Sequence, residues 1–121
     1  LPSELFFESA SATLGNAGRV ELDKLANIFE EIAAEIPEDI NWILRIDGHT
    51  DQRPINTERF PSNWELSTAR AVSVVRYLAD QGIEQERMAA AGFGEHHPVD
   101  PRFTEQAFQN NRRIEIKLTN R

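Results

Sequence analysis

The longest amphipathic stretch of the chain runs from about Asn16 to Ile36. Apolar residues recur there at the spacing of one helix face, whereas the charged residues lie off that face. Asn16 is a candidate N-cap, and Pro37 cannot continue a helix. The pattern therefore predicts a helix whose apolar face consists of Leu25, Ile28, Phe29, Ile32 and Ile36.

A second helix is predicted between Ser62 and Gly82 because both of its ends carry capping signals. Ser62 followed by Glu65 three residues later is a capping box. Gly82 suits the C′ position, and Ile83 after it can pack against Leu78 in a Schellman motif. The apolar stripe expected to face the core consists of Ala71, Val74, Val75 and Leu78.

Shorter apolar runs indicate strands. Apolar and polar residues alternate in 42–47 and again in 113–118, which is typical of half-buried strands. Residues 5–7 and 88–93 are expected to form two further strands. The segment between the last two strands is polar and is expected to be irregular apart from one helical turn at 105–108.

Strands and helices in this order are typical of an α+β domain. We expect a mixed sheet of about four strands with helices packed on one face. The long connections suit crossovers, and the alternating strands suit a sheet that is covered on one side only. The length of 121 residues fits one compact domain spanning 1–121, without internal repeat or linker.

The charge balance and the absence of cysteine narrow the possible partners and chemistry. The formal net charge is -7 at pH 7, and the sequence pI is about 4.9. An acidic chain without a basic stripe is a poor partner for nucleic acid and for anionic lipid. The absence of cysteine excludes thiolate nucleophiles and cysteine-based zinc sites.

The apolar runs of the sequence are short compared with those of membrane proteins. No apolar run reaches the ~18 residues of a membrane helix, and no signal peptide opens the sequence. The chain begins at Leu1 without a methionine. We therefore expect a piece of a longer protein that contacts a membrane only through a segment upstream of Leu1.

The segment from Asp47 to Arg70 carries most of the candidate chemistry. It follows a predicted strand, and loops at strand ends are often held in place for binding. Asn63 and Arg70 lie seven residues apart on the second helix and share one face. Asp51 and Arg70 either form a structural ion pair with each other or recognise a zwitterionic ligand. In the second case the guanidinium of Arg70 binds the ligand's carboxylate, and the carboxylate of Asp51 accepts from the ligand's ammonium group. The residue types alone leave both alternatives open.

Catalytic and metal-binding patterns are weak by comparison. Asp47 and Asp51 could flank a bond as glycosidase carboxylates do, but no second acidic cluster accompanies them. Ser67 lies in a predicted helix without the G-x-S-x-G elbow of a hydrolase. His49 is isolated, and His96 and His97 are adjacent rather than at metal-ligand spacing, so all three are expected in turns or on the surface. The sequence thus predicts no enzyme, no cofactor and no metal site.

Five short motifs occur in order along nearly the whole chain. They are Phe7-Glu8-Ser9-Ala10, Asp47-Gly48-His49-Thr50-Asp51, Asn63-Trp64-Glu65-Leu66-Ser67-Thr68-Ala69-Arg70-Ala71, Ala91-Gly92-Phe93-Gly94-Glu95 followed by Pro98, and Asn111-Arg112-Arg113-Ile114-Glu115-Ile116. Each motif is weak by itself. In this order and at these distances they resemble the OmpA-like domain of bacterial envelope proteins.

The resemblance implies non-covalent binding of peptidoglycan through the diaminopimelate of its stem peptide. Asp51 would accept from the ligand's ammonium group and Arg70 would hold its carboxylate, which is the zwitterion alternative above. Thr50 and Asn63 match positions that shape the pocket. The family's Asn-Arg-Arg motif, from which one arginine is expected to support the site, corresponds to Asn111, Arg112 and Arg113.

The loop between Asp51 and Arg70 resembles one branch of the family in particular. Its length, the run Arg53-Pro54-Ile55 and the run from Ser62 to Ser67 are similar to MotB, the peptidoglycan anchor of the flagellar motor stator. That branch implies a homodimer in the periplasm of a Gram-negative-type bacterium, anchoring an envelope complex to the wall. The alternatives are an outer-membrane or lipoprotein anchor of the same family and a periplasmic peptidoglycan hydrolase.

Overall fold

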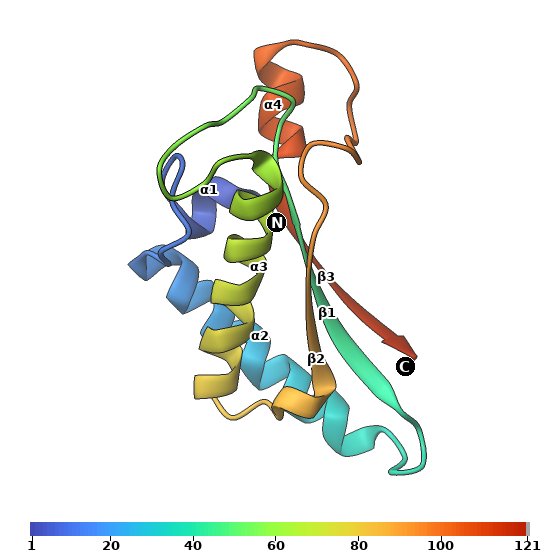
Figure 1. The fold of residues 1–121 in the computed structure, drawn as a ribbon. Coiled ribbons are helices and arrows are strands. Elements are labelled where there is room, and N and C mark those ends of the chain that lie inside the picture. The colour runs from blue at the N-terminus through green and yellow to red at the C-terminus, as the bar shows by residue number, and fades with distance from the viewer. Residues whose placement is uncertain (121) are drawn as a thin grey trace.

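The computed structural model describes residues 1–120 (Figure 1). Its elements in chain order are α1 (Ser3–Phe6), α2 (Asn16–Glu35), β1 (Trp42–His49), α3 (Asn63–Asp80), the 3-10 turn η1 (Gln85–Arg87), β2 (Met88–Gly92), α4 (Glu105–Asn111) and β3 (Arg113–Asn120). The predicted α+β class is confirmed. None of the helices in this part of the chain is long and apolar enough to cross a membrane.

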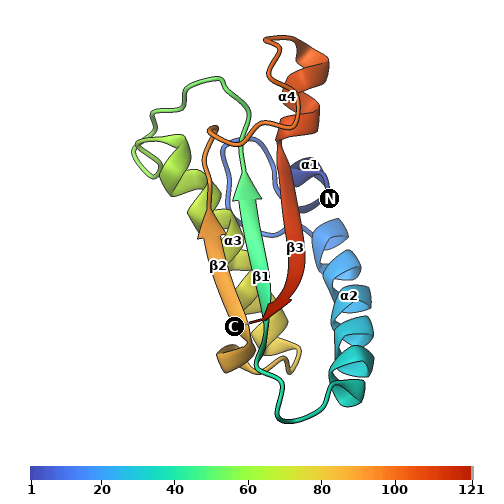
Figure 2. The ribbon, with the colours of Figure 1, turned by 90° about the vertical axis from the view of Figure 1, so that its right-hand side faces the viewer.

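The three strands form one mixed sheet in the order β2-β1-β3. The central strand β1 pairs in parallel with β2 and antiparallel with β3. The chain passes through α3 between β1 and β2. Helices α2 and α3 lie on one side of the sheet, and α4 lies beyond its end (Figures 1 and 2). The prediction that helices pack on one face is therefore confirmed.

The core lies between this sheet and the two long helices. Leu44 and Ile46 of β1 point toward the helices and are 0% exposed. Residues 45, 47 and 49 alternate with them and point to the opposite face of the sheet. The buried apolar cluster comprises Phe6, Phe7, Leu22, Ala26, Leu44, Ile46, Ala71, Val74, Leu78, Ile83 and Ile114.

The predicted first strand at residues 5–7 is wrong, and the sheet has three strands rather than about four. A strand would place Phe6 and Phe7 on opposite faces. The helical turn of α1 instead brings both rings into the same core, where they are 1% and 5% exposed with their centroids 6.1 Å apart. Burying two large rings together outweighs the strand propensity of the run.

Helix α2 spans the predicted residues but presents a different face to the core. Ile28 and Ile32 are 48% and 39% exposed, which contradicts the predicted orientation, and the rest of that face is half-buried. A Cβ on Gly18 would lie 2.8 Å from the Cα of Phe6, so the missing side chain lets α2 approach α1 closely. The helix also begins one position earlier, with Gly15 as its N-cap. Its buried residues are Gly18, Leu22 and Ala26.

Both predicted caps of α3 are confirmed. The Ser62 side chain accepts a backbone N–H of the first turn at 3.2 Å, and its hydroxyl donates to the Glu65 carboxylate at 2.6 Å. At the other end, the Ile83 N–H donates to the Leu78 carbonyl at 3.1 Å, the long bond of a Schellman motif. Gly82 has a φ of 106°, which glycine adopts at no steric cost.

Two strand glycines bring α3 against the sheet. A Cβ on Gly48 would lie 2.3 Å from the carbonyl oxygen of Ser67, and a Cβ on Gly92 would lie 2.0 Å from Oγ1 of Thr68. Real Cβ atoms do not approach other atoms this closely, so these positions require glycine. The contact fixes the start of α3 beside the carboxyl end of β1, where the candidate site lies.

Candidate ligand-binding site

A cavity of about 470 Å³ opens where the loop after β1 meets the start of α3 and the N-terminal segment. Its wall combines charged side chains from four separate parts of the chain with apolar side chains of the loop and helix. Its polar lining includes Thr50, Asp51, Arg53, Asn63, Arg70 and Arg112. Long-range folding thus assembles most of the predicted site residues around one space.

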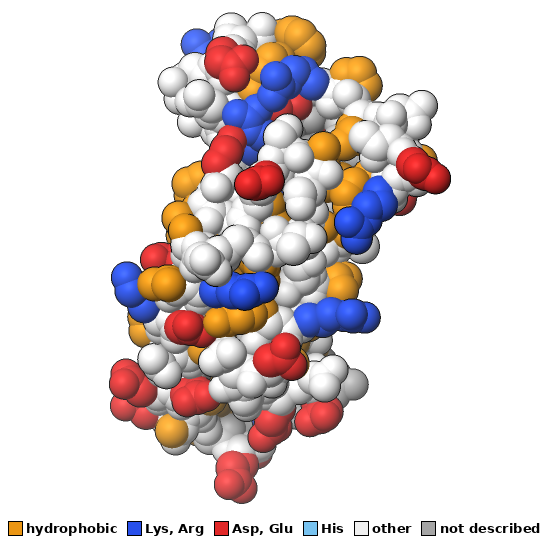
Figure 3. All heavy atoms as spheres, turned by 90° about the vertical axis from the view of Figure 1, so that its left-hand side faces the viewer, with side chains coloured by type: hydrophobic (Ala, Val, Ile, Leu, Met, Phe, Trp, Pro, Cys, Tyr) orange, Lys and Arg blue, Asp and Glu red, His pale blue; other side chains and the backbone are white. Residues whose placement is uncertain are grey.

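On the face drawn in Figure 3, Asp and Glu side chains are more crowded at the end of the molecule opposite this cavity than around it. In Figure 3, Asp and Glu side chains crowd the lower end, where α2 ends and η1 lies in Figure 1. Lys and Arg side chains lie higher on the same face. The net charge of -7 therefore does not describe the cavity, which is lined by three arginines and two acidic residues.

Asp51 is the more buried of the two acidic residues that line the cavity, with its side chain 8% exposed against 52% for Glu4. Its Oδ2 accepts from Nη2 of Arg53 at 2.7 Å and from Nη1 of Arg112 at 2.7 Å. Its Oδ1 accepts the backbone N–H of Arg53 at 2.8 Å. Burial alone would raise the pKa of Asp51, but the hydrogen bonds from Arg53 and Arg112 outweigh it and hold the pKa below its usual value. The carboxylate is therefore ionised at neutral pH.

Arg70 faces the same cavity from α3 and is 5% exposed. Its Nε donates to the carbonyl of Ser11 at 2.8 Å, and its Nη2 donates to the carbonyl of Glu8 at 3.1 Å. The guanidinium also lies over the Phe7 ring, 5.2 Å from its centroid. Burial lowers the pKa of Arg70, although nearby Glu4 opposes this shift. Arginine nevertheless keeps its charge in proteins.

Asp51 and Arg70 do not form an ion pair with each other. Every acceptor that Arg70 contacts within residues 1–120 is a neutral backbone carbonyl, and its Nη1 donates to no protein group there. The structural ion pair considered from the sequence is therefore absent from this part of the chain. Two opposite charges face one cavity, with donors of Arg70 free for a ligand.

Thr50 and Asn63 hold the loop that carries Asp51. The Thr50 N–H donates to the carbonyl of Gly94 at 2.9 Å, and its hydroxyl donates to the carbonyl of Asp51 at 3.0 Å. Asn63, from the first turn of α3, donates through Nδ2 to the carbonyl of Arg53 at 3.0 Å. Both side chains are buried, so they fix the shape of the cavity wall.

The Asn-Arg-Arg motif is divided among three places. Arg112 lines the cavity and bridges Asp51 to Glu4, whose Oε1 it contacts at 2.6 Å. Asn111 is 0% exposed and holds the neighbouring loop through Asp100, accepting its N–H at 3.0 Å. Arg113 does not line the cavity and pairs with Glu115 on the outer face of the sheet. Arg112 is thus the arginine of the motif that touches the predicted site.

The N-terminal segment forms a wall that sequence reasoning did not assign to the site. Ser3, Glu4 and Phe7 line the cavity, and the carbonyls of Glu8 and Ser11 orient Arg70. These partners are 59 and 62 residues away from Arg70 along the chain. The only sequence signal for them was the Phe7-Glu8-Ser9-Ala10 motif.

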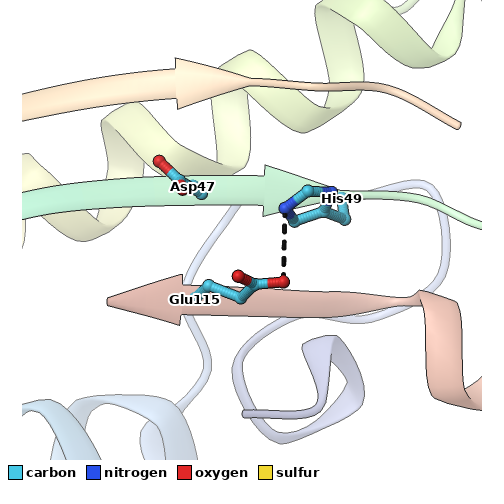
Figure 4. A group of neighbouring side chains, drawn as sticks. All are labelled: Asp47, His49 and Glu115. Carbon is cyan, nitrogen blue, oxygen red and sulfur yellow. Dashed lines mark ion pairs between the residues drawn. The ribbon is translucent and has the colours of Figure 1, made fainter. Parts of the chain in front are cut away.

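A second charged cluster lies on the outer face of the sheet, where β1 and β3 pair (Figure 4). Asp47 accepts from Nε and Nη2 of Arg45, both at 2.8 Å, and lies 3.6 Å from Nζ of Lys117. Glu115 pairs with Arg113 and with Lys117 at 3.2 Å. Like charges lie directly opposite across the two strands, and the attractive contacts form with their neighbours.

Asp47, His49 and Glu115 of this cluster bring ligand atoms of metal-binding type within 4.8 Å of one another. However, the two carboxylates already have three cationic partners, Arg45, Arg113 and Lys117. A divalent ion would enter a group of positive net charge, which opposes its binding. The charge balance therefore favours a structural ion-pair cluster.

His49 is buried within this cluster at 5% exposure rather than lying in a surface turn as expected. Its ring stacks on Phe93 with centroids 5.0 Å apart, and Nε2 points toward Glu115 at 3.5 Å (Figure 4). Burial, together with the charge of Arg113, lowers the pKa of His49 to about 4. His49 is therefore neutral at neutral pH.

Asp47, Asp51 and Ser67, the residues considered for catalysis, have separate partners in the described part of the chain. Asp47 and Asp51 have different arginine partners, and only Asp51 lines the cavity. The Ser67 hydroxyl donates to the Trp64 carbonyl at 3.2 Å and accepts from the Gly94 N–H at 3.0 Å. It thus bonds to backbone, as expected for a serine inside a helix.

The profile of the OmpA family matches residues 6–112. The chain therefore belongs to the OmpA family.

Relatives of this chain include several envelope and motility proteins. YtxE of Bacillus subtilis is 34% identical over 98% of this chain and 46% of its own length. Motility protein B of Helicobacter pylori strain J99 is 28% identical over 96% of this chain and 43% of its own length. The chain thus spans about half the length of the curated relatives that it matches.

Solved structures with the same fold extend over nearly all of this chain. A MotB-like protein from Desulfovibrio vulgaris has a TM-score of 0.87 and 32% identity, covering 100% of this chain and 73% of that structure. The cell wall anchor of the type VI secretion system from Pseudomonas aeruginosa has a TM-score of 0.84 and 30% identity, covering 99% and 78%. The periplasmic domain of Helicobacter pylori MotB has a TM-score of 0.84 and 26% identity, covering 99% and 79%.

Proposed function

We propose that this domain binds peptidoglycan non-covalently and recognises the diaminopimelate of the stem peptide in the cavity beside Asp51 and Arg70. The observation that carries the proposal is the cavity itself, in which a buried carboxylate and a separate buried guanidinium face the same space. The carboxylate accepts from the ligand's ammonium group. The guanidinium holds the ligand's carboxylate through donors that the protein leaves free.

The surrounding residues suit the same ligand. Arg112 donates a hydrogen bond to Asp51, and Thr50 and Asn63 fix the backbone of the loop. Asn111 acts from outside the cavity by ordering the loop next to Asp51. The space of about 470 Å³ is within the range of small-molecule pockets, so an amino-acid side chain of a larger polymer fits.

The biological role that follows is an anchor between an envelope complex and the cell wall. The relatives named motility protein B and the structure described as a cell wall anchor support this role. We place the domain in the periplasm and, by analogy with the motility relatives, in a flagellar stator-like complex acting as a homodimer. Two domains on one complex raise the avidity for the wall without new contacts. An outer-membrane or lipoprotein anchor of the same family is the alternative complex.

The domain is proposed to bind the wall without cutting it. Hydrolysis of a glycosidic bond needs two carboxylates on either side of that bond. Asp47, the candidate partner of Asp51, is held by Arg45 and Lys117 away from the cavity lining. Prolonged incubation with purified wall should therefore release no soluble fragments.

The test is co-sedimentation with purified insoluble peptidoglycan of the diaminopimelate type and of the lysine type. Lysine lacks the carboxylate that Arg70 holds, so the wild-type chain should pellet with the first wall and at least tenfold more weakly with the second. Arg70→Ala should lose this preference. Arg87→Ala is the matched control, because it removes one arginine at Trp42, outside this cavity.

Each outcome has a definite meaning. Equal pelleting with both walls would move recognition to the glycan and remove Arg70 from the site. Thermal unfolding of each variant separates loss of binding from loss of fold, which matters because Arg70 also orients the N-terminal segment. Arg70→Lys, which keeps the charge but not the planar fork, should retain the fold and still lose most of the preference.

A further inference from the structure

The ammonium subsite of the cavity is already occupied by one of the chain's own side chains. Oδ2 of Asp51 accepts from Nη2 of Arg53 at 2.7 Å, from Nε of Arg53 at 3.2 Å and from Nη1 of Arg112 at 2.7 Å. A carboxylate oxygen has two lone pairs, so three donors saturate it. An ammonium group that binds Oδ2 therefore has to displace one of them, whereas Oδ1 accepts only the backbone N–H of Arg53.

The charge balance opposes entry in the same way. Glu4 shares Arg112 with Asp51, so the three arginines that line the cavity face two acidic residues and the lining carries a net positive charge. A ligand ammonium group would be repelled by this charge as long as all three arginines stay in place. Departure of one arginine leaves a neutral lining, which the ammonium group enters without net repulsion.

Arg53 is the arginine that is able to leave. Its side chain is 47% exposed and stands on the loop, whereas the Arg112 side chain is 20% exposed and is tied to Glu4 as well. Arg53 also lies over the ring of Phe108, 4.6 Å from its centroid. Phe108 is 6% exposed and stays in position, so the guanidinium can rest on it after leaving Asp51.

We infer that Arg53 is an intramolecular latch that occupies the ammonium subsite on Asp51 and must be displaced before the wall ligand binds. This inference rests on the proposed function and adds a regulated step to it. The backbone N–H of Arg53 remains on Oδ1 of Asp51 at 2.8 Å, so the loop keeps its place while the side chain moves. The latch lowers the affinity for every ligand that presents an ammonium group to Asp51, because only the open fraction binds.

The test compares Arg53→Gln with Arg59→Gln in pelleting isotherms with the two insoluble walls used above. Arg59 is an exposed arginine of the same loop that contacts Phe60 and not Asp51, so its variant removes the same charge without touching the latch. Arg53→Gln should bind both walls roughly three- to tenfold more tightly, by the same factor for each, since an exposed ion pair is lost. Arg59→Gln should bind like the wild-type chain.

The outcomes separate the latch from the proposed function. Binding by the wild-type chain with unchanged or weaker binding by Arg53→Gln would overturn the latch and leave the function standing. If Arg53→Gln bound only the diaminopimelate wall more weakly, the latch would also be overturned, because Arg53 would then bind the ligand's carboxylate. Binding by Arg53→Gln but not by the wild-type chain would support a latch that is mostly closed. Binding by neither would overturn the function and the latch together.

Discussion

The carboxyl half of β1 and the loop after it deliver two aspartates to two different charged clusters. Asp47, on the outer face of the sheet, meets Arg45 and Lys117 from the same two strands. Asp51, at the cavity, meets Arg53 and Arg112. Both are buried, and both carry arginine partners, so burial and pairing do not distinguish them.

The difference lies in what faces the space beside each aspartate. In the outer cluster, each carboxylate and each cation has an oppositely charged partner on its own strand or on the neighbouring one. The cavity cluster adds a third arginine, Arg70, whose acceptors are neutral carbonyls. Within residues 1–120 Arg70 has no acidic hydrogen-bond or ion-pair partner, and it lines the cavity, so a ligand carboxylate can pair with it there. The two clusters therefore differ in whether every charged side chain has an oppositely charged partner, and this difference distinguishes a structural cluster from one that can bind a ligand.

The largest expected effect is on binding and contrasts the two aspartates. Asp51→Asn should weaken binding to the diaminopimelate wall by roughly 30- to 100-fold, about 2–3 kcal/mol, because the ammonium group loses its charged acceptor. Asp47→Asn should leave binding unchanged and instead lower the free energy of unfolding by about 1–2 kcal/mol, since Arg45 and Lys117 lose their shared partner. Pelleting isotherms and denaturant unfolding measure the two effects. Equal losses of binding in both variants would remove the contrast.

A backbone change should damage both clusters at once. Gly48→Ala places a Cβ against the Ser67 carbonyl, which belongs to the helix backbone and cannot turn away. We expect a loss of about 2–3 kcal/mol in the free energy of unfolding from overpacking, together with weaker wall binding as α3 shifts. Gly15→Ala is the control, because its Cβ would meet only the Phe6 carbonyl at 3.9 Å. Similar stability of the two variants would show that α3 does not need this close contact.

The smallest effect uses pH to separate the clusters. The pKa of His49 is lowered to about 4 in the folded state, whereas an unfolded histidine titrates near pH 6.5. As the pH falls from 7 to 5 the unfolded chain takes up a proton that the folded chain does not. The free energy of unfolding should therefore fall by about 1–2 kcal/mol over this range.

The matched variant is His49→Phe, which keeps a ring to stack on Phe93 and cannot take up a proton. It should flatten the pH dependence measured by denaturant unfolding. Wall binding by the wild-type chain should stay constant between pH 7 and 5, because the pKa of Asp51 lies below its usual value and the carboxylate remains ionised. A parallel fall in binding would place His49 or its neighbours in the binding site.

Local signals in the sequence predicted the local features of this fold. The caps of α3 follow from residues within a few positions of each other, Ser62 with Glu65 and Gly82 with Ile83, and both are observed. The strand at residues 5–7 was predicted wrongly because a three-residue apolar run has no period that separates a helix from a strand. The exposed positions of Ile28 and Ile32 depend on how closely Gly18 lets α2 approach α1, which periodicity does not encode.

For the candidate site, the sequence by itself determined which groups are available. It offered Asp51 after a strand and Asn63 and Arg70 on one helix face, and the structure brings all three to one cavity. Only the tertiary structure decided how these groups are used. Packing between distant segments brings the carbonyls of the N-terminal segment to Arg70. It also places Arg112 in the cavity and leaves Arg113 outside it. The ion pair between Arg53 and Asp51 forms within the loop that this packing holds in place. Side-chain spacing along one element is a local geometric property. Whether a charged side chain finds an oppositely charged partner depends instead on every residue that folding brings near it.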